Sequence, residues 1–443
     1  MRFAPGAAMA AFSSVLLSAC GGTSPALQPM APAGTSALSR AAGATPAPLY
    51  HVVYRFKGAP DGAVANGGLI AVGGLLYGTT LAGSKNFCAR SCFGDGNHCW
   101  EGCGVIFSVD ASGGENIVYN FQGDLNGASD GSWPLSGPIL YKRRLYGTTT
   151  SGGKYGNGTV YAADTSGNEH VVYSFKGNTD GATDGAYPAA PVIAIENTLY
   201  GTTARGGRTA CGDVGCGTVY SLTTSGKRNF LYRFKGAGKH DGAGAYPGLV
   251  ALDGELYGAT YQGGRQGGEC STTGCGTIYE ISFDGTERVV HRFAGGADGS
   301  VPNGLIAVNG LLYGTTLTSG AHNEGTFFSI TPAGKLTTLY SFQGKPDAAS
   351  PSGTLIYSGG NFYGVSQSGG TGGGGSIFGL GTIFTVTASG QERVLYSFHG
   401  RLDGSLAQAP LFPFNGLLYG TTAYGGGNGC HRYGCGTVFN LKP

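Results

Sequence analysis

Charged residues are scarce in this sequence: they make up 12% of its 443 positions, and the net charge is only +2. No basic stripe is present, so the electrostatic pattern of a nucleic-acid-binding protein is missing and no nucleic-acid partner is expected. Phosphate-loop, dinucleotide-binding and His-Glu-x-x-His patterns are missing too. Beyond the N-terminus no stretch of 18 apolar residues occurs, so no membrane span is predicted.

Glycine, in contrast, is abundant, with 86 residues, and hydrophobic residues make up 41% of the chain. The glycines follow no Gly-X-Y period, so this composition favours many short strands joined by tight turns. The hydrophobic fraction is too high for an intrinsically disordered chain and can form a buried core.

The pentapeptide Leu-Tyr-Gly-Thr-Thr organises the sequence. It is intact around five tyrosines and altered around two more, and successive copies lie 50 to 69 residues apart. Regular recurrence at this spacing indicates one supersecondary unit repeated seven times. The seven tyrosines are Tyr77, Tyr146, Tyr200, Tyr257, Tyr313, Tyr363 and Tyr419.

Each repeat contains four strand-like pieces in a fixed order. In one repeat, residues 302–308 form the first piece and Asn309-Gly310 the turn, a pair that favours a type I′ hairpin. The pentapeptide is the second piece, Gly-Thr-Val-Phe the third, and Val-Tyr-x-Phe the fourth. Alternating aromatic and β-branched residues suit half-buried strands. The repeat therefore predicts an all-β, kelch-like, seven-bladed β-propeller with four antiparallel strands per blade, over residues 50–443.

The phase of the repeat predicts how the ring closes. A fourth-type strand at 51–57 comes first, and a third-type strand at 436–441 comes last, so the N-terminal strand can complete the C-terminal blade. An open β-solenoid is the alternative. In a propeller the first strand of each repeat lines the axis, and the long loops after the second and fourth strands share one face. We predict that this long-loop face carries the binding site.

The N-terminus resembles a bacterial lipoprotein signal. Residues 1–19 combine Arg2 with an apolar stretch and end in Leu17-Ser18-Ala19, just before Cys20. The resemblance implies that Cys20 is acylated and anchors the protein, and Gly21 favours the outer membrane or cell surface. An ordinary secretory cleavage is the alternative. Residues 20–49 read as the acylated cysteine followed by a flexible tether.

Ten further cysteines fit an oxidising, extracytoplasmic compartment. Three pairs share one repeat position and are expected to form disulfides: Cys211–Cys216, Cys270–Cys275 and Cys430–Cys435. Four thiolates from neighbouring blades could instead bind zinc. In the longest insertion we predict Cys88–Cys92 and Cys99–Cys103, with the nested pairing 88–103 and 92–99 as the alternative.

An aspartate, usually followed by glycine, stands before each first strand; Asp130, Asp184 and Asp241 are examples. Such a residue ordinarily accepts backbone N–H bonds within a turn. The other interpretation is an acidic ring near the axial mouth that needs a cation to offset its repulsion, and calcium is the candidate, although residues 180–185 lack a full calcium loop. No metal or other cofactor is otherwise expected.

Aromatic residues on the predicted long loops form the second candidate site. The only tryptophans are Trp100 and Trp133, and Trp133 precedes a proline, as do Tyr187 and Tyr246. These rings either pack between blades or form a shelf that stacks a sugar or another flat ligand.

Together, Leu-Tyr-Gly-Thr-Thr, Gly-Thr-Val-Phe and Tyr-Ser-Phe with a following Asp-Gly resemble the GloVer tandem repeat of bacterial surface proteins with varied anchors. The resemblance covers about residues 50–443 and implies surface display; it transfers no activity and no catalytic residue. We expect a monomeric, non-catalytic binding module for a glycan or a protein. An extracytoplasmic glycoside hydrolase or lyase that uses carboxylates of the long-loop face is one alternative, and a structural envelope protein is the other.

Overall fold

The computed structural model describes residues 49–443 except 87, 89–90, 93–98, 124–129, 179–182, 208–210, 374–378, 428 and 431–432. The predicted signal peptide, the predicted acylation site Cys20 and the predicted tether up to residue 48 therefore lie outside the described residues. One compact unit, residues 48–91 and 100–443, contains the repeats.

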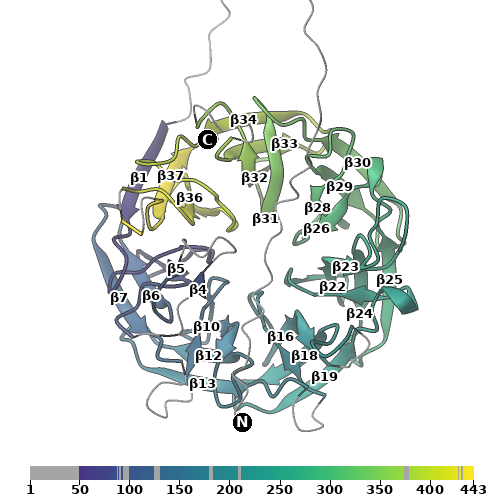
Figure 1. Ribbon diagram of the computed structural model, residues 1–443, viewed down its shortest axis with the longest axis horizontal. Helices are drawn as coiled ribbons and strands as arrows, with labels where there is room; N and C mark the ends of the chain where they lie inside the picture. Colours follow the sequence, from purple (N-terminus) through teal and green to yellow (C-terminus); the bar gives the residue numbers. More distant parts are fainter. Residues whose placement is uncertain are drawn as a thin grey trace, which may run out of the picture. The chain divides into compact units, whose positions relative to one another are not determined.

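Seven sheets of antiparallel strands form a ring in this unit (Figure 1). Blades 1 to 3 are, from the first strand to the fourth, β2(Ile70–Val72), β3(Leu75–Thr80), β6(Val105–Val109), β7(Glu115–Asn120); β9(Ile139–Tyr141), β10(Arg144–Thr149), β12(Thr159–Ala163), β13(Glu169–Ser174); and β15(Ile193–Ile195), β16(Thr198–Thr203), β18(Thr218–Thr223), β19(Arg228–Arg233). Blades 4 to 6 are β21(Leu249–Leu252), β22(Glu255–Thr260), β24(Thr277–Ile281), β25(Glu287–Arg292); β27(Ile306–Val308), β28(Leu311–Thr318), β29(Thr326–Ile330), β30(Leu336–Ser341); and β31(Ala348–Ser358), β32(Asn361–Gly369), β33(Thr382–Thr387), β34(Glu392–Ser397).

Blade 7 combines both ends of the chain. Its strands are β35(Phe412–Phe414), β36(Leu417–Thr422), β37(Thr437–Lys442) and, from the N-terminal side, β1(Leu49–Arg55). β1 pairs antiparallel with β37 from Leu49↔Lys442 to Arg55↔Thr437. The predicted closed, seven-bladed propeller is confirmed, and the open solenoid was wrong.

The core lies between blades rather than inside any one sheet. Seven hydrophobic clusters are present, and each combines residues of two neighbouring blades, including blades 7 and 1. A phenylalanine directly after the fourth strand is buried in every blade: Phe56, Phe121, Phe175, Phe234, Phe293, Phe342 and Phe398. Because every cluster needs both of its blades, we expect the ring to unfold cooperatively.

The glycine of the pentapeptide makes room for a ring on the next strand. A Cβ added to Gly147 of β10 would lie 2.3 Å from the hydroxyl of Tyr161, its cross-strand partner on β12. Tyr161 is fully buried, so this ring cannot move aside into solvent. Glycine at this position of the motif is therefore required by packing against Tyr161.

The two threonines of the motif bind in different directions. In blade 2 the Thr149 hydroxyl lies 2.8 Å from the Thr159 hydroxyl on the adjacent strand, within the same blade. The Thr148 hydroxyl instead donates to the Ala190 carbonyl of blade 3, at 2.9 Å. One threonine thus fixes the sheet, and the other joins neighbouring blades.

Replacing Thr148 by valine should remove this hydrogen bond between blades. The buried Ala190 carbonyl and Ser136 hydroxyl would each lose Thr148 as a hydrogen-bond partner. We expect a loss of about 1 to 2 kcal/mol in the free energy of unfolding, measured by urea denaturation. Blade 4 has Ala259 at this position, and Ala259→Ser is the control that should cost less. A Thr148→Val protein as stable as the parent would contradict a role for the hydroxyl.

The two faces of the ring differ as predicted. The turns after the first and third strands are short, as at Gly73-Gly74 and Asp110–Gly114. The loops after the second and fourth strands meet on the other side, where Trp133 N–H donates to the Cys103 carbonyl at 2.8 Å. These loops form the long-loop face; the short turns form the short-turn face.

Candidate binding face

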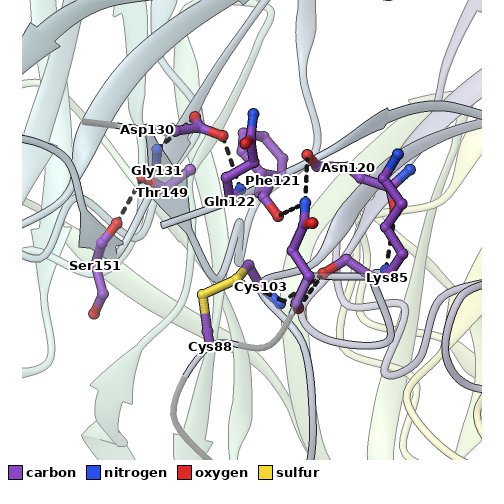
Figure 2. Close-up of a disulfide and its surroundings, with 12 residues drawn as sticks. Lys85, Cys88, Cys103, Asn120, Phe121, Gln122, Asp130, Gly131, Thr149 and Ser151 are labelled. Atoms are coloured by element: carbon purple, nitrogen blue, oxygen red, sulfur yellow. Dashed lines mark hydrogen bonds between the residues drawn. A yellow bond between two sulfur atoms is a disulfide. The ribbon is translucent and has the colours of Figure 1, made fainter. Parts of the chain in front are cut away.

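The aspartate after each fourth strand is a bound turn residue. The Asp130 carboxylate accepts the N–H groups of Gln122 at 2.8 Å and Gly131 at 2.6 Å, and the Tyr119 hydroxyl at 3.0 Å. Figure 2 shows this turn beside the Cys88–Cys103 disulfide. Burial is the main cause of a raised pKa for Asp130.

Asp184 and Asp241 repeat this arrangement with Tyr173 and Tyr232, the tyrosines of their own fourth strands. Both aspartates are buried. The fourth strand, which carries these tyrosines, is the outermost of each blade (Figure 1). The first interpretation, a turn residue that accepts backbone N–H bonds, describes these aspartates; the alternative of an acidic ring at the axial mouth does not, because the hydroxyl and backbone donors belong to the fourth strand and its turn.

A second carboxyl group from the next blade faces this turn at four junctions. Its pKa is raised mainly by burial and further by the neighbouring aspartate, to about 7 in Glu115, about 8 in Glu169, about 7 in Glu287 and about 9 in Glu392. At the junction of blades 2 and 3 an arginine stands there instead, and Arg228 Nε lies 3.7 Å from Asp184. The same tyrosine–aspartate–glutamate group occurs at four junctions between blades. We therefore interpret it as part of the scaffold.

The third residue after each aspartate adopts a left-handed backbone conformation. Its φ lies between 50° and 68° in all seven blades, and its N–H donates to the loop of the preceding blade. These seven residues are Val64, Trp133, Tyr187, Gly244, Val301, Ser350 and Leu406. Only one of them is glycine, although glycine adopts this conformation without steric cost.

Non-glycine residues here are strained, by about 1 to 3 kcal/mol each. Strained positions concentrate at functional sites, and a large side chain at positive φ calls for a reason. In blades 2 and 3 the strained residues are Trp133 and Tyr187, both half-buried on the long-loop face.

An aromatic run extends from these two residues into blade 4. The Thr150 hydroxyl donates to the Trp133 carbonyl at 3.0 Å. The side chain of Tyr187 is also hydrogen-bonded to Thr150. The Tyr187 and Tyr246 rings lie 5.9 Å apart, edge to face, and Tyr246 stacks on Tyr261 at 5.0 Å. The predicted shelf residues Tyr187 and Tyr246 are thus brought together, whereas Trp133 is connected to this group only by its backbone carbonyl, which accepts the Thr150 hydroxyl.

The sequence suggested that Tyr246 is the equivalent of Trp133, because both precede a proline. The structure shows that it is not. Blade 4 carries two extra residues, so Gly244 occupies the left-handed position and donates to the Cys216 carbonyl at 2.9 Å. Trp100 belongs to β5(Cys99–Trp100), which pairs with β4(Ser91–Cys92). The side chain of Trp100 lies outside the described residues.

Sequence reasoning missed two members of this run. Tyr261 stacks on Tyr246, and the Arg205 guanidinium lies 4.7 Å from the centre of the Tyr187 ring. Tyr261 is the first residue after its Tyr-Gly-x-Thr motif and Arg205 the second after its own, both at the start of the long loop. Counting from the motif, rather than from the prolines, would have found them.

Disulfides hold the bases of the long loops. Cys211–Cys216, Cys270–Cys275 and Cys430–Cys435 form the three pairs expected from the repeat. Because these sulfurs are bonded to one another, the zinc alternative does not describe them. Cys88 is bonded to Cys103, so the predicted Cys88–Cys92 and Cys99–Cys103 bridges were wrong. The side chains of Cys92 and Cys99 lie outside the described residues.

The described residues contain no cluster of three or more His, Cys, Asp or Glu side chains that could hold a metal ion. Residues 180–182 of the weak calcium-like segment 180–185 lie outside the described residues. No helix in the described part of the chain has the length and apolar character needed to cross a bilayer.

Fold and site together define a closed seven-bladed propeller, built from a tandem repeat, with one face of long, disulfide-held loops. The model of the Gloeobacter/Verrucomicrobia repeat matches residues 95–306 and 265–443. The chain belongs to this family, as the resemblance to the GloVer repeat had predicted.

Solved structures similar to the chain include the computationally designed Ika8 protein, with 13% identity over 88% of this chain and 98% of that one and a TM-score of 0.46. The luciferin-regenerating enzyme shows 12% identity over 69% and 90%, with a TM-score of 0.39. A gluconolactonase from Xanthomonas campestris shows 15% identity over 68% and 82%, with a TM-score of 0.35. No curated protein matches the sequence.

Proposed function

We propose that this protein is a lipid-anchored surface module that binds a carbohydrate, without catalysis, on the long-loop face of blades 2 to 4. Trp133 and Tyr187 supply the ring faces, and Tyr246 and Tyr261 extend the platform. Acylation at Cys20 and a flexible tether would hold the propeller at the outer membrane or cell surface, where such a ligand is found.

The observation that carries this proposal is the backbone strain at Trp133 and Tyr187. Gly244 shows that glycine fits the same position in blade 4. The same conformation occurs in all seven blades, so the strain alone belongs to the repeat; what distinguishes blades 2 and 3 is that a large, half-buried aromatic ring is kept there at a cost to stability.

This difference can be measured with Trp133→Gly and Tyr187→Gly. If the rings serve binding, glycine should leave the thermal midpoint unchanged or raise it, while affinity for a glycan selected on an array falls about tenfold or more. Calorimetric titration and differential scanning calorimetry give the two readouts. Leu406→Gly, at the same position in blade 7, is the matched control and should keep full affinity.

The opposite pattern would contradict the proposal. If the rings only pack between blades, both glycine variants should lose stability through the cavity they leave and keep their affinity. A soluble protein of residues 49–443 that binds no glycan on the array would also count against it.

A glycoside hydrolase or lyase is the second candidate function, and carboxylate pairs with raised pKa values favour it in principle. The pairs in this structure, such as Asp130 with Glu169, lie at the outer rim and recur at four junctions. A catalytic centre needs one such pair beside a substrate site, so we favour binding. A purely structural envelope role is the third candidate, and the glycine variants separate it from the first.

A further inference from the structure

A cavity of about 340 Å³ opens on the short-turn face of blade 6, at the small end of the range for ligand sites. Its lining consists of Asn361, Tyr363, Thr385, Thr387, Gln391, Glu392 and Arg393. Most of these are neutral hydrogen-bonding side chains, and one is an arginine. This composition suits a small polar ligand better than an apolar one.

Two lining threonines of this cavity already have partners: the Thr385 hydroxyl donates to the Phe362 carbonyl, and the Thr387 hydroxyl pairs with Ser389 and accepts the Gln391 N–H. No hydrogen bond joins the side chains of Asn361, Gln391 or Arg393 to other described residues. The Tyr363 ring makes no ring–ring contact within the described part of the chain, whereas Tyr200 of blade 3 lies 5.3 Å from the ring of Phe283. Tyr363 packs in part against the cluster between blades 6 and 7, and an aromatic ring beside amide and guanidinium donors is a usual arrangement for a sugar ring.

Blade 4 shows what fills the same space elsewhere in the ring. Its Tyr257 and Arg288 both face Glu280 on the third strand: the tyrosine hydroxyl donates to the carboxylate at 2.8 Å, and Arg288 forms an ion pair with it. The strand register pairs Glu280 with both residues.

Blade 6 keeps the tyrosine and the arginine of this arrangement but not the carboxylate. Tyr363 and Arg393 stand in the same registers, and both pair with Thr385. Because Thr385 is short and has no carboxylate, the position that the Glu280 carboxylate fills in blade 4 is open beside the Arg393 guanidinium. A ligand carboxylate could therefore occupy the place that Glu280 fills in blade 4.

We infer that this cavity binds a sugar acid, with its carboxylate on Arg393 and Tyr363 and its hydroxyl groups on the side-chain amides of Asn361 and Gln391. Arginine matches a carboxylate through charge-assisted hydrogen bonds. Glu392 does not compete for the arginine at neutral pH, because burial and its hydrogen bond with Asp347 raise its pKa to about 9.

The test uses D-glucuronate, D-glucose and acetate as probes, titrated into the protein and followed by saturation-transfer NMR and calorimetry. We expect D-glucuronate to bind at least about tenfold more tightly than either of the others, since it alone offers both groups. Thr385→Glu should restore the internal ion pair of blade 4 and abolish binding. Arg393→Gln should weaken glucuronate about tenfold, to the level of glucose.

The matched control is Ser221→Glu, which adds the same carboxylate at the equivalent register of blade 3 and should leave binding unchanged. Arg393 is exposed, so its variant should fold even if Thr385→Glu does not. Unchanged glucuronate binding in Arg393→Gln, acetate or glucose as tight as glucuronate, or no binding of glucuronate would each overturn the inference.

This site is separate from the long-loop face, so the two proposals fail independently. Trp133→Gly should not affect glucuronate binding in the blade 6 cavity. Thr385→Glu should not affect glycan binding by Trp133 and Tyr187.

Discussion

A chain that begins at residue 58 should not form a stable ring, whereas a chain that begins at residue 49 should fold like the full-length protein. The shorter chain lacks β1, so β37 becomes an exposed edge and blade 7 has three strands. Exposed edges of this kind pair with other chains, and we expect aggregation or a lowered thermal midpoint with reduced cooperativity.

The contacts of β1 explain why the effect should be large. Val53 and Phe56 are buried in the cluster between blades 7 and 1. On the other side, Tyr50 stacks on Tyr396 of blade 6, with ring centres 3.9 Å apart, and its hydroxyl donates to the Asp403 carbonyl. Loss of Phe56 alone, as Phe56→Ala, should cost about 3 to 5 kcal/mol.

Calorimetry and size-exclusion chromatography on the two chains provide the measurement. A synthetic peptide of residues 49–57 should restore a single cooperative transition to the shorter chain, because it supplies the missing strand. Equal midpoints for the two chains, or rescue by a scrambled peptide, would show that the N-terminal strand does not close the ring.

The fold could be predicted because its determinants are local and repeated. The spacing of Tyr77 and its six equivalents set the number of blades, and the phase of residues 51–57 set the closure. The disulfides at the shared repeat position followed from their spacing as well, since Cys211 and Cys216 are only five residues apart. Each of these signals appears in the sequence within one repeat or at its ends.

The site could be predicted only in part, because its geometry depends on contacts between repeats. The partner of Asp130 at the outer rim is Glu169, which lies in the next blade and has no fixed sequence distance as a signal. The two-residue insertion before Tyr246 moved that ring out of register. The blade 6 cavity results from Thr385 where blade 4 has Glu280, which is visible only once the strand register is known.

The carboxyl pairs between blades lead to a pH dependence that an ordinary acidic protein would not show. Glu169 binds its proton more tightly in the folded state, with a pKa near 8, than in the unfolded chain, where glutamate has a pKa of about 4.3. The stability that the folded state gains from this tighter proton binding is therefore complete below pH of about 4 and is lost as the pH rises toward 8. Glu115, Glu287 and Glu392 act in the same direction. The free energy of unfolding should fall between pH 5 and 9.

Glu169→Gln should flatten this dependence, because glutamine has nearly the same shape but does not titrate. With allowance for solvent screening, we expect Glu169→Gln to raise the free energy of unfolding by about 2 kcal/mol at pH 9 and to change it little at pH 5. Urea denaturation at both pH values is the measurement. Arg228→Gln is the matched control at the junction where the glutamate is already replaced: it removes the ion pair with Asp184 and should destabilise the protein at both pH values. If Glu169→Gln has the same effect at pH 5 and pH 9, the glutamate does not carry a proton between the blades.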